Sequence, residues 1–109
     1  MKTLDAMAVA FGDVGSVPTT KTTYTGFLFG KAKTKERMDP QTGELLPAKE
    51  IDILYLQDKK GNYFATRSEG LVRQLESVKE QLESVEEITL EVKEKDLGQG
   101  RRVKRFIRV

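Results

Sequence analysis

The alternation of apolar and polar residues predicts several strands and one helix. Residues 22–33 are rich in threonine, tyrosine and phenylalanine, a composition typical of a long strand. Gly26 and Gly30 interrupt this strand and indicate a bulge or sharp bend, which lets one strand curl into both halves of a small barrel. Residues 50–57 and 63–66 form a predicted hairpin, because the sequence DKKGN between them is a tight turn signal.

The period of the pattern changes in the second half of the chain. After Ser68, a predicted N-cap, apolar residues recur at helical spacing. Residues 88–92 alternate between apolar and polar, which is typical of a half-buried strand, and a turn at 96–100 leads into a last strand over 102–109. The order is therefore three strands, one helix and two strands. The helical stripe comprises Leu71, Val72, Leu75, Val78 and Leu82.

Two segments lie outside this pattern. Residues 1–18 are small and apolar, then glycine-rich, and we expect a short extra strand or arm there. The remaining residues, 19–109, are expected to form one domain, since 109 residues are too few for two cores. Residues 34–49 are expected to form a long loop or flexible hairpin that turns at 39–43.

A short internal repeat lies within the predicted helix. The sequence QLESV at 74–78 recurs seven residues later at 81–85. Two heptads are too few for a stable coiled coil, so we expect the apolar stripe to pack on the barrel. A helix-mediated dimer is the alternative.

The net charge of +2 hides a segregation of charge along the chain. Residues 21–37 carry five bases and one acid, residues 69–96 carry nine acids and four bases, and residues 101–109 carry five bases and no acid. Such asymmetry indicates a polyanionic partner. The acidic helix is expected to be a solvated face turned away from the ligand, or else a landing site for a basic partner.

Missing residue types narrow the possible chemistry. The chain has no cysteine and no histidine, which removes disulfides, thiolate nucleophiles, imidazole bases and ordinary zinc sites. The short glycine motifs at 12–15 and 98–100 do not suffice for phosphate-binding loops. We therefore expect no enzymatic activity, no cofactor and no metal. No apolar run suits a signal peptide or a membrane span, so a cytoplasmic protein is expected.

The order of three strands, a helix and two strands resembles the OB-fold from residue 22 to residue 109. The likeness is one of architecture, without a diagnostic motif. It implies a mainly β, five-stranded barrel whose ligand lies across strands two and three, between the loops at 34–49 and 95–101. At this size the chain is similar to the compact single-stranded DNA-binding proteins of bacteria, plasmids and phages. It ends in a basic strand where many bacterial members have an acidic tail, so a phage- or plasmid-encoded relative is expected.

Aromatic and basic residues near these loops are the candidate nucleic-acid ligands, because sequence-tolerant binding needs cations along the phosphates and flat side chains on which bases stack. On the last strand, Lys104, Phe106 and Arg108 share the face opposite Val103 and Ile107. The alternative places the phenylalanines in the core. The candidate set is Phe27, Phe29, Lys31, Lys33, Lys35, Arg37, Tyr55, Tyr63, Arg101, Arg102, Lys104, Phe106 and Arg108.

The sequence thus predicts a sequence-tolerant single-stranded DNA-binding protein that coats or protects strands in replication or recombination. DNA is favoured over RNA as the partner, and a homo-oligomer is expected. The alternative is a protein-interaction OB module whose acidic helix and heptad pair hold a partner or a second copy.

Overall fold

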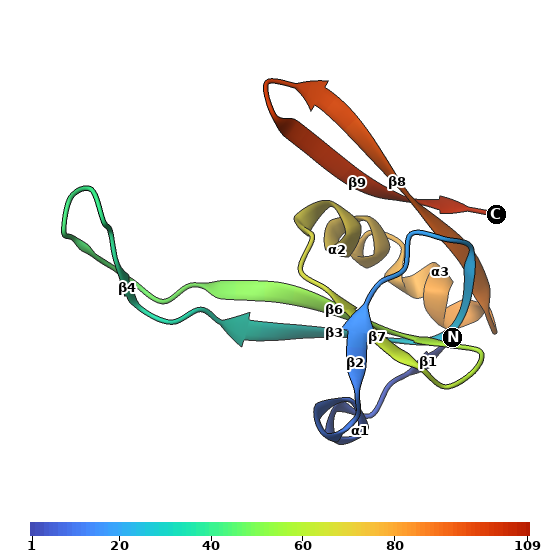
Figure 1. The fold of residues 1–109 in the computed structure, drawn as a ribbon. Helices are drawn as coiled ribbons and strands as arrows, with labels where there is room; N and C mark the ends of the chain where they lie inside the picture. Colours follow the sequence, from blue (N-terminus) through green and yellow to red (C-terminus); the bar gives the residue numbers. More distant parts are fainter.

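A computed structural model describes residues 1–109 and shows a mainly β protein with short helices (Figure 1). The helices are α1 (Ala6–Phe11), α2 (Glu69–Glu76) and α3 (Lys79–Ser84). The strands are β1 (Lys2–Thr3), β2 (Val14–Ser16), β3 (Thr22–Lys33), β4 (Arg37–Met38), β5 (Leu45–Leu46), β6 (Glu50–Asp58), β7 (Tyr63–Thr66), β8 (Ile88–Gly98) and β9 (Arg101–Arg108).

The long strand β3 organises the sheet. It pairs antiparallel with β6 at Tyr24 and from Gly26 to Lys33, and its first three residues pair antiparallel with β8. The register shifts between Tyr24 and Gly26, which is the bulge that the glycine in this strand predicts. The extra residue keeps Tyr24 and Phe27 on the same side of the sheet, where each ring is only 1% exposed. One strand therefore contributes to both halves of the core.

The sheet curls but does not close. Six of its seven strands follow the order β2-β7-β6-β3-β8-β9, and β1 pairs with β3 beside this path. The predicted closed five-stranded barrel is therefore wrong, because β7 and β9 do not pair with each other. The free edge of β7 takes β2 in parallel instead, and the chain then crosses to β8, where the Thr19 carbonyl accepts a hydrogen bond from the Val92 N–H at 3.2 Å.

The predicted helix is present as two pieces, α2 and α3, separated at Ser77 and Val78. Leu71, Val72, Leu75 and Leu82 of its predicted stripe pack on the inner face of the sheet at 2–3% exposure, whereas Val78, at the break between the two pieces, is 38% exposed. Both leucines of the repeated heptad are thus in the core, and no apolar stripe is left for a coiled coil. None of the three helices is long and apolar enough to cross a membrane. The core consists of Met1, Tyr24, Phe27, Leu54, Leu56, Leu71, Val72, Leu75, Leu82, Leu90, Val92 and Phe106.

The side chain of Gln74 on α2 holds strand β9 in place. Its Nε2 donates to the Phe106 carbonyl at 2.8 Å, and its Oε1 accepts from the Phe106 N–H at 2.7 Å. An N–H and a C=O on the open edge of β9 are satisfied in this way. The side-chain amide thus substitutes locally for the neighbouring strand that a closed barrel would supply.

The N-terminal segment covers the outer face of the sheet. Leu4, Val9 and Ile53 are each 5% exposed, but they lie outside the main core, on the face opposite Leu54. Gly26 is required here, because a Cβ atom would run into the Leu4 side chain. Residues 1–18, predicted as a strand or arm, therefore form two short strands and one helix.

Asp58 organises the turn between β6 and β7. One carboxylate oxygen accepts from the N–H groups of Lys60 at 3.0 Å and Asn62 at 2.8 Å, and the other accepts from the Asn62 amide at 3.1 Å. Burial alone would raise the pKa of Asp58, but these hydrogen bonds outweigh it and lower the pKa below its ordinary value. Burial raises the pKa of Tyr24, which lies beside it, and the Asp58 charge adds to that rise.

Candidate nucleic-acid interface

The β8–β9 hairpin extends beyond the core and carries most of the uncompensated positive charge (Figure 1). On its inner face the buried pair Val92 and Phe106 meets the core. The alternate residues form the outer face, where Lys93 lies opposite Arg105 and Lys95 lies opposite Val103. Like charges directly opposite each other destabilise a strand pair. The outer face therefore comprises the cations Lys93, Lys95, Arg101 and Arg105, the acid Glu91, and the apolar residues Val103 and Ile107.

Acids compensate little of the charge on the outer face, whereas on the inner face Glu94 and Asp96 lie opposite Lys104 and Arg102. Lys93 pairs with Glu91 at 3.2 Å, and none of the five bases of β9 makes an ion pair. All five are exposed. Arg105 faces outward and lies opposite another cation, Lys93. A negatively charged ligand would relieve this repulsion.

The arm made by β3 and β6 differs electrostatically from this hairpin. Lys31 lies opposite Asp52 and Lys33 lies opposite Glu50, and the Lys31 ammonium is 3.9 Å from the Glu50 carboxylate. Acids of β6 thus offset the basic stretch of β3. The predicted cations Lys35 and Arg37 lie beyond, at the small hairpin of β4 and β5, and are exposed. Residues 31–52 carry five bases and five acids, so this arm has no net charge.

Two of the three phenylalanines proposed for base stacking are in the core. Phe27 is 1% exposed, and Phe106 is 3% exposed beneath α2. The face assignment on the last strand was wrong for Phe106, because Val103 and Ile107, expected to be inside, are 43% and 40% exposed. Phe29 is half-buried, packs against the core and meets the Phe27 ring edge-on. These three phenylalanine rings therefore pack in or against the core, as the alternative interpretation expected.

The two predicted tyrosines lie on the outer face of the sheet, where the OB likeness places a ligand. Both are half-buried. The ring of Tyr55 lies over Gly30 and lines a groove of about 520 Å³ between α1 and the sheet. The ring of Tyr63 lies against Gly12 of the N-terminal segment. That segment therefore occupies part of the expected ligand face and contacts the ring of Tyr63.

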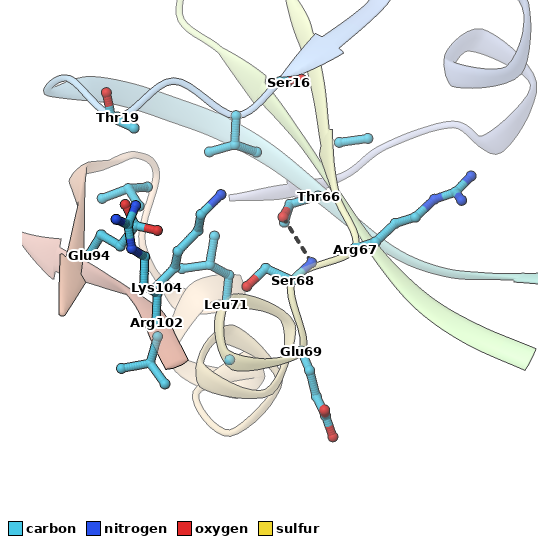
Figure 2. Close-up of a pocket in the computed structure, with 15 residues that line it drawn as sticks. Ser16, Thr19, Thr66, Arg67, Ser68, Glu69, Leu71, Glu94, Arg102 and Lys104 are labelled. Atoms are coloured by element: carbon cyan, nitrogen blue, oxygen red, sulfur yellow. Dashed lines mark hydrogen bonds between the residues drawn. The ribbon is translucent and has the colours of Figure 1, made fainter. Parts of the chain in front are cut away.

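A cleft lies at the open seam between β7 and β9. This seam cleft has a volume of about 780 Å³. Residues 16–19 form one side, residues 65–71 form another, and β8 and β9 close the third. Figure 2 shows Lys104 extending into the cleft, while Arg67 and Glu69 point away from its centre. Of the predicted cations, the cleft brings together Arg102 and Lys104.

Sequence reasoning missed the cations Lys93, Lys95 and Arg105 of the hairpin and the hydroxyl residues of the cleft. The hairpin residues could have been found from the turn at 96–100, because antiparallel pairing about that turn places Lys93 and Lys95 opposite β9. The cleft had no such signal, since it depends on the crossing of residues 16–19. Searches against protein families, curated proteins and solved structures find no significant match to this chain.

Proposed function

We propose that this protein binds single-stranded nucleic acid, with DNA favoured over RNA, chiefly through the β8–β9 hairpin. The observation that carries the proposal is the outer face of that hairpin, where Lys93 faces Arg105 and one acid accompanies four cations. Such a face is stabilised when phosphates take up the space between the cations. The interleaved apolar residues Val103 and Ile107 favour unpaired bases, whose flat faces a duplex would hide.

The strand order supports this proposal independently. The elements β3, β6, β7, the α2–α3 pair, β8 and β9 follow one another as the parts of an OB domain do. We propose that the half-barrel is an OB-type unit left open between β7 and β9. Its role would be to coat and protect single strands in replication or recombination, as a phage- or plasmid-encoded protein.

The test is an anisotropy titration with an unstructured deoxythymidine oligonucleotide at several salt concentrations. If about four phosphates are neutralised, log affinity should fall against log salt with a slope of about −3. Matched arms with single-stranded RNA and duplex DNA should show weaker binding. No binding at about 50 mM salt, or stronger binding of duplex, would contradict the proposal.

A charge-reversal pair localises the interface. The double variant R101E/R105E should lower the affinity by about tenfold or more and make the salt slope shallower by about 1.4, since two phosphate contacts are lost. The control K33E/K35E makes the same change of charge on the neutral arm and should alter affinity far less. Equal losses from both variants would show that binding follows net charge alone.

The competing proposal, a protein-interaction module held by the acidic helix and heptad pair, finds no support in the packing. Leu75 and Leu82 contact the core and are not available to a partner helix. Self-association by another surface stays a prediction, to be tested by sizing at several protein concentrations with and without oligonucleotide.

A further inference from the structure

The seam cleft differs in chemistry from the outer face of the β8–β9 hairpin. The outer face is open and follows the hairpin, whereas the cleft is a hollow enclosed on three sides. The two are separated by the alternation of β9, which directs Arg101 and Arg105 outward and Arg102 and Lys104 to the other side. A strand bound to the outer face therefore does not by itself fill the cleft.

One wall of the cleft is apolar. Val17 contributes from the crossing segment, Leu71 from the first turn of α2, and Val92 from β8. Leu71 and Val92 belong to the core, and Val17 packs against it, so this wall is rigid and its side chains are held in place. Leu71 and Val92 are only 2% and 8% exposed, so the half-buried Val17 gives most of the dry surface that a flat, weakly polar group such as a nucleobase would contact.

The remaining wall is polar and carries net positive charge. Figure 2 shows the Lys104 ammonium directed into the space between Thr66 and the segment at 16–19. Arg102 and Glu94 also line this wall, and no ion pair joins Glu94 to either cation. Glu94 lies opposite Lys104, and Asp96, which lies opposite Arg102, is outside the cleft lining. The Lys104 ammonium directed into the cleft favours a ligand with a phosphate over a neutral one.

Hydroxyl groups complete the polar wall. The Thr66 hydroxyl accepts a hydrogen bond from the Ser68 N–H at 3.1 Å, which fixes the loop before α2 (Figure 2). The Ser68 hydroxyl does not cap α2. It remains able to donate to a ligand oxygen in the cleft.

We infer that the seam cleft binds one nucleotide unit, with its base against Val17, Leu71 and Val92 and its phosphate at Lys104 and Arg102. The volume of about 780 Å³ is within the range of pockets that enclose small organic ligands. This inference rests on the proposed function, because the nucleotide would be one unit of the bound strand, turned out of the stack into the cleft.

The test uses the full chain and thymidine 5′-monophosphate, a probe too small to span the outer face. Methyl resonances of Val17, Leu71 and Val92 should shift and saturate, with a dissociation constant of about 1 mM. Lys104→Gln should weaken this binding by about tenfold, because the phosphate loses a charged partner. Arg105→Gln, the neighbouring change on the opposite face of β9, should leave mononucleotide binding within about twofold and still weaken oligonucleotide binding.

Four other results would overturn the inference. Equal binding of inorganic phosphate without methyl shifts would show an anion site that does not take the base. Oligonucleotide binding without any mononucleotide effect on these methyl groups would leave the proposed function standing and reject the nucleotide site. Absence of binding by both probes would reject the proposed function as well. Unchanged mononucleotide binding by Lys104→Gln would place the ligand elsewhere.

Discussion

The bridge from Gln74 to Phe106 allows a sharp test of how strand β9 is held. In Gln74→Ala, the Phe106 N–H and C=O lose partners at 2.7 and 2.8 Å. Each hydrogen bond contributes about 1 kcal/mol, and incomplete rehydration of these part-buried groups adds to the loss. The expected decrease in unfolding free energy is therefore about 2–3 kcal/mol, or roughly 10–15 °C in Tm for a domain of this size.

The internal repeat supplies the matched control. Gln81 occupies the same heptad position as Gln74, but its side chain is exposed and makes no hydrogen bond. Gln81→Ala should therefore change the unfolding free energy by less than about 0.5 kcal/mol. Urea unfolding followed by circular dichroism measures both variants under identical conditions. Equal stabilities of the two variants would refute the bridge as the element that anchors β9.

Three further predictions concern the core, the turn between β6 and β7, and the outer face of the sheet beneath the N-terminal segment. Phe106→Ala should lower the unfolding free energy by about 3–4 kcal/mol in urea titrations. A variant of unchanged stability with weakened oligonucleotide binding would instead show that Phe106 is a surface residue that contacts the ligand. Because the pKa of Asp58 is lowered in the folded state, its stabilisation is present above the unfolded value near 3.9 and is lost as pH falls through the folded pKa. Thermal melts should thus show a smaller loss of stability between about pH 5 and pH 3 for Asp58→Asn, and parallel curves would contradict this. Gly26→Ala should crowd Leu4 and cost about 1 kcal/mol, seen as faster amide exchange in β1, and unchanged exchange would show that Leu4 moves aside freely.

Local periodicity was sufficient to predict most of the elements. Strands 22–33 and 63–66 have the predicted bounds, and the bulge lies beside Gly26. These features depend on neighbours within a few residues, so a single sequence contains their signal. The break in the helix at Ser77 and Val78 was missed because both heptads carry the same helical pattern.

Features that depend on register and closure could not be predicted. The alternation on β9 is regular, but whether a face is buried depends on where the hairpin leaves the body, and only Phe106 is close enough to α2 to be covered. The charge of β3 was overestimated because Asp52 and Glu50 lie opposite its lysines only once β6 is paired with it. Of the candidate site, the sequence identified the basic strand β9 and its Arg101, but neither Lys93, Lys95 and Arg105 of the outer face nor the cleft.

The parallel pairing of β2 with β7 has a consequence for the order of folding. This contact joins Val14 to Tyr63, whereas β6 and β7 pair as a local hairpin. Contacts between distant parts of a chain form late, since loop closure must come first. We therefore expect the hairpins to assemble before residues 16–19 cross the seam. A nucleotide that contacts both sides of the seam would hold that crossing in place. Binding of single-stranded nucleic acid would therefore raise the stability of the folded protein.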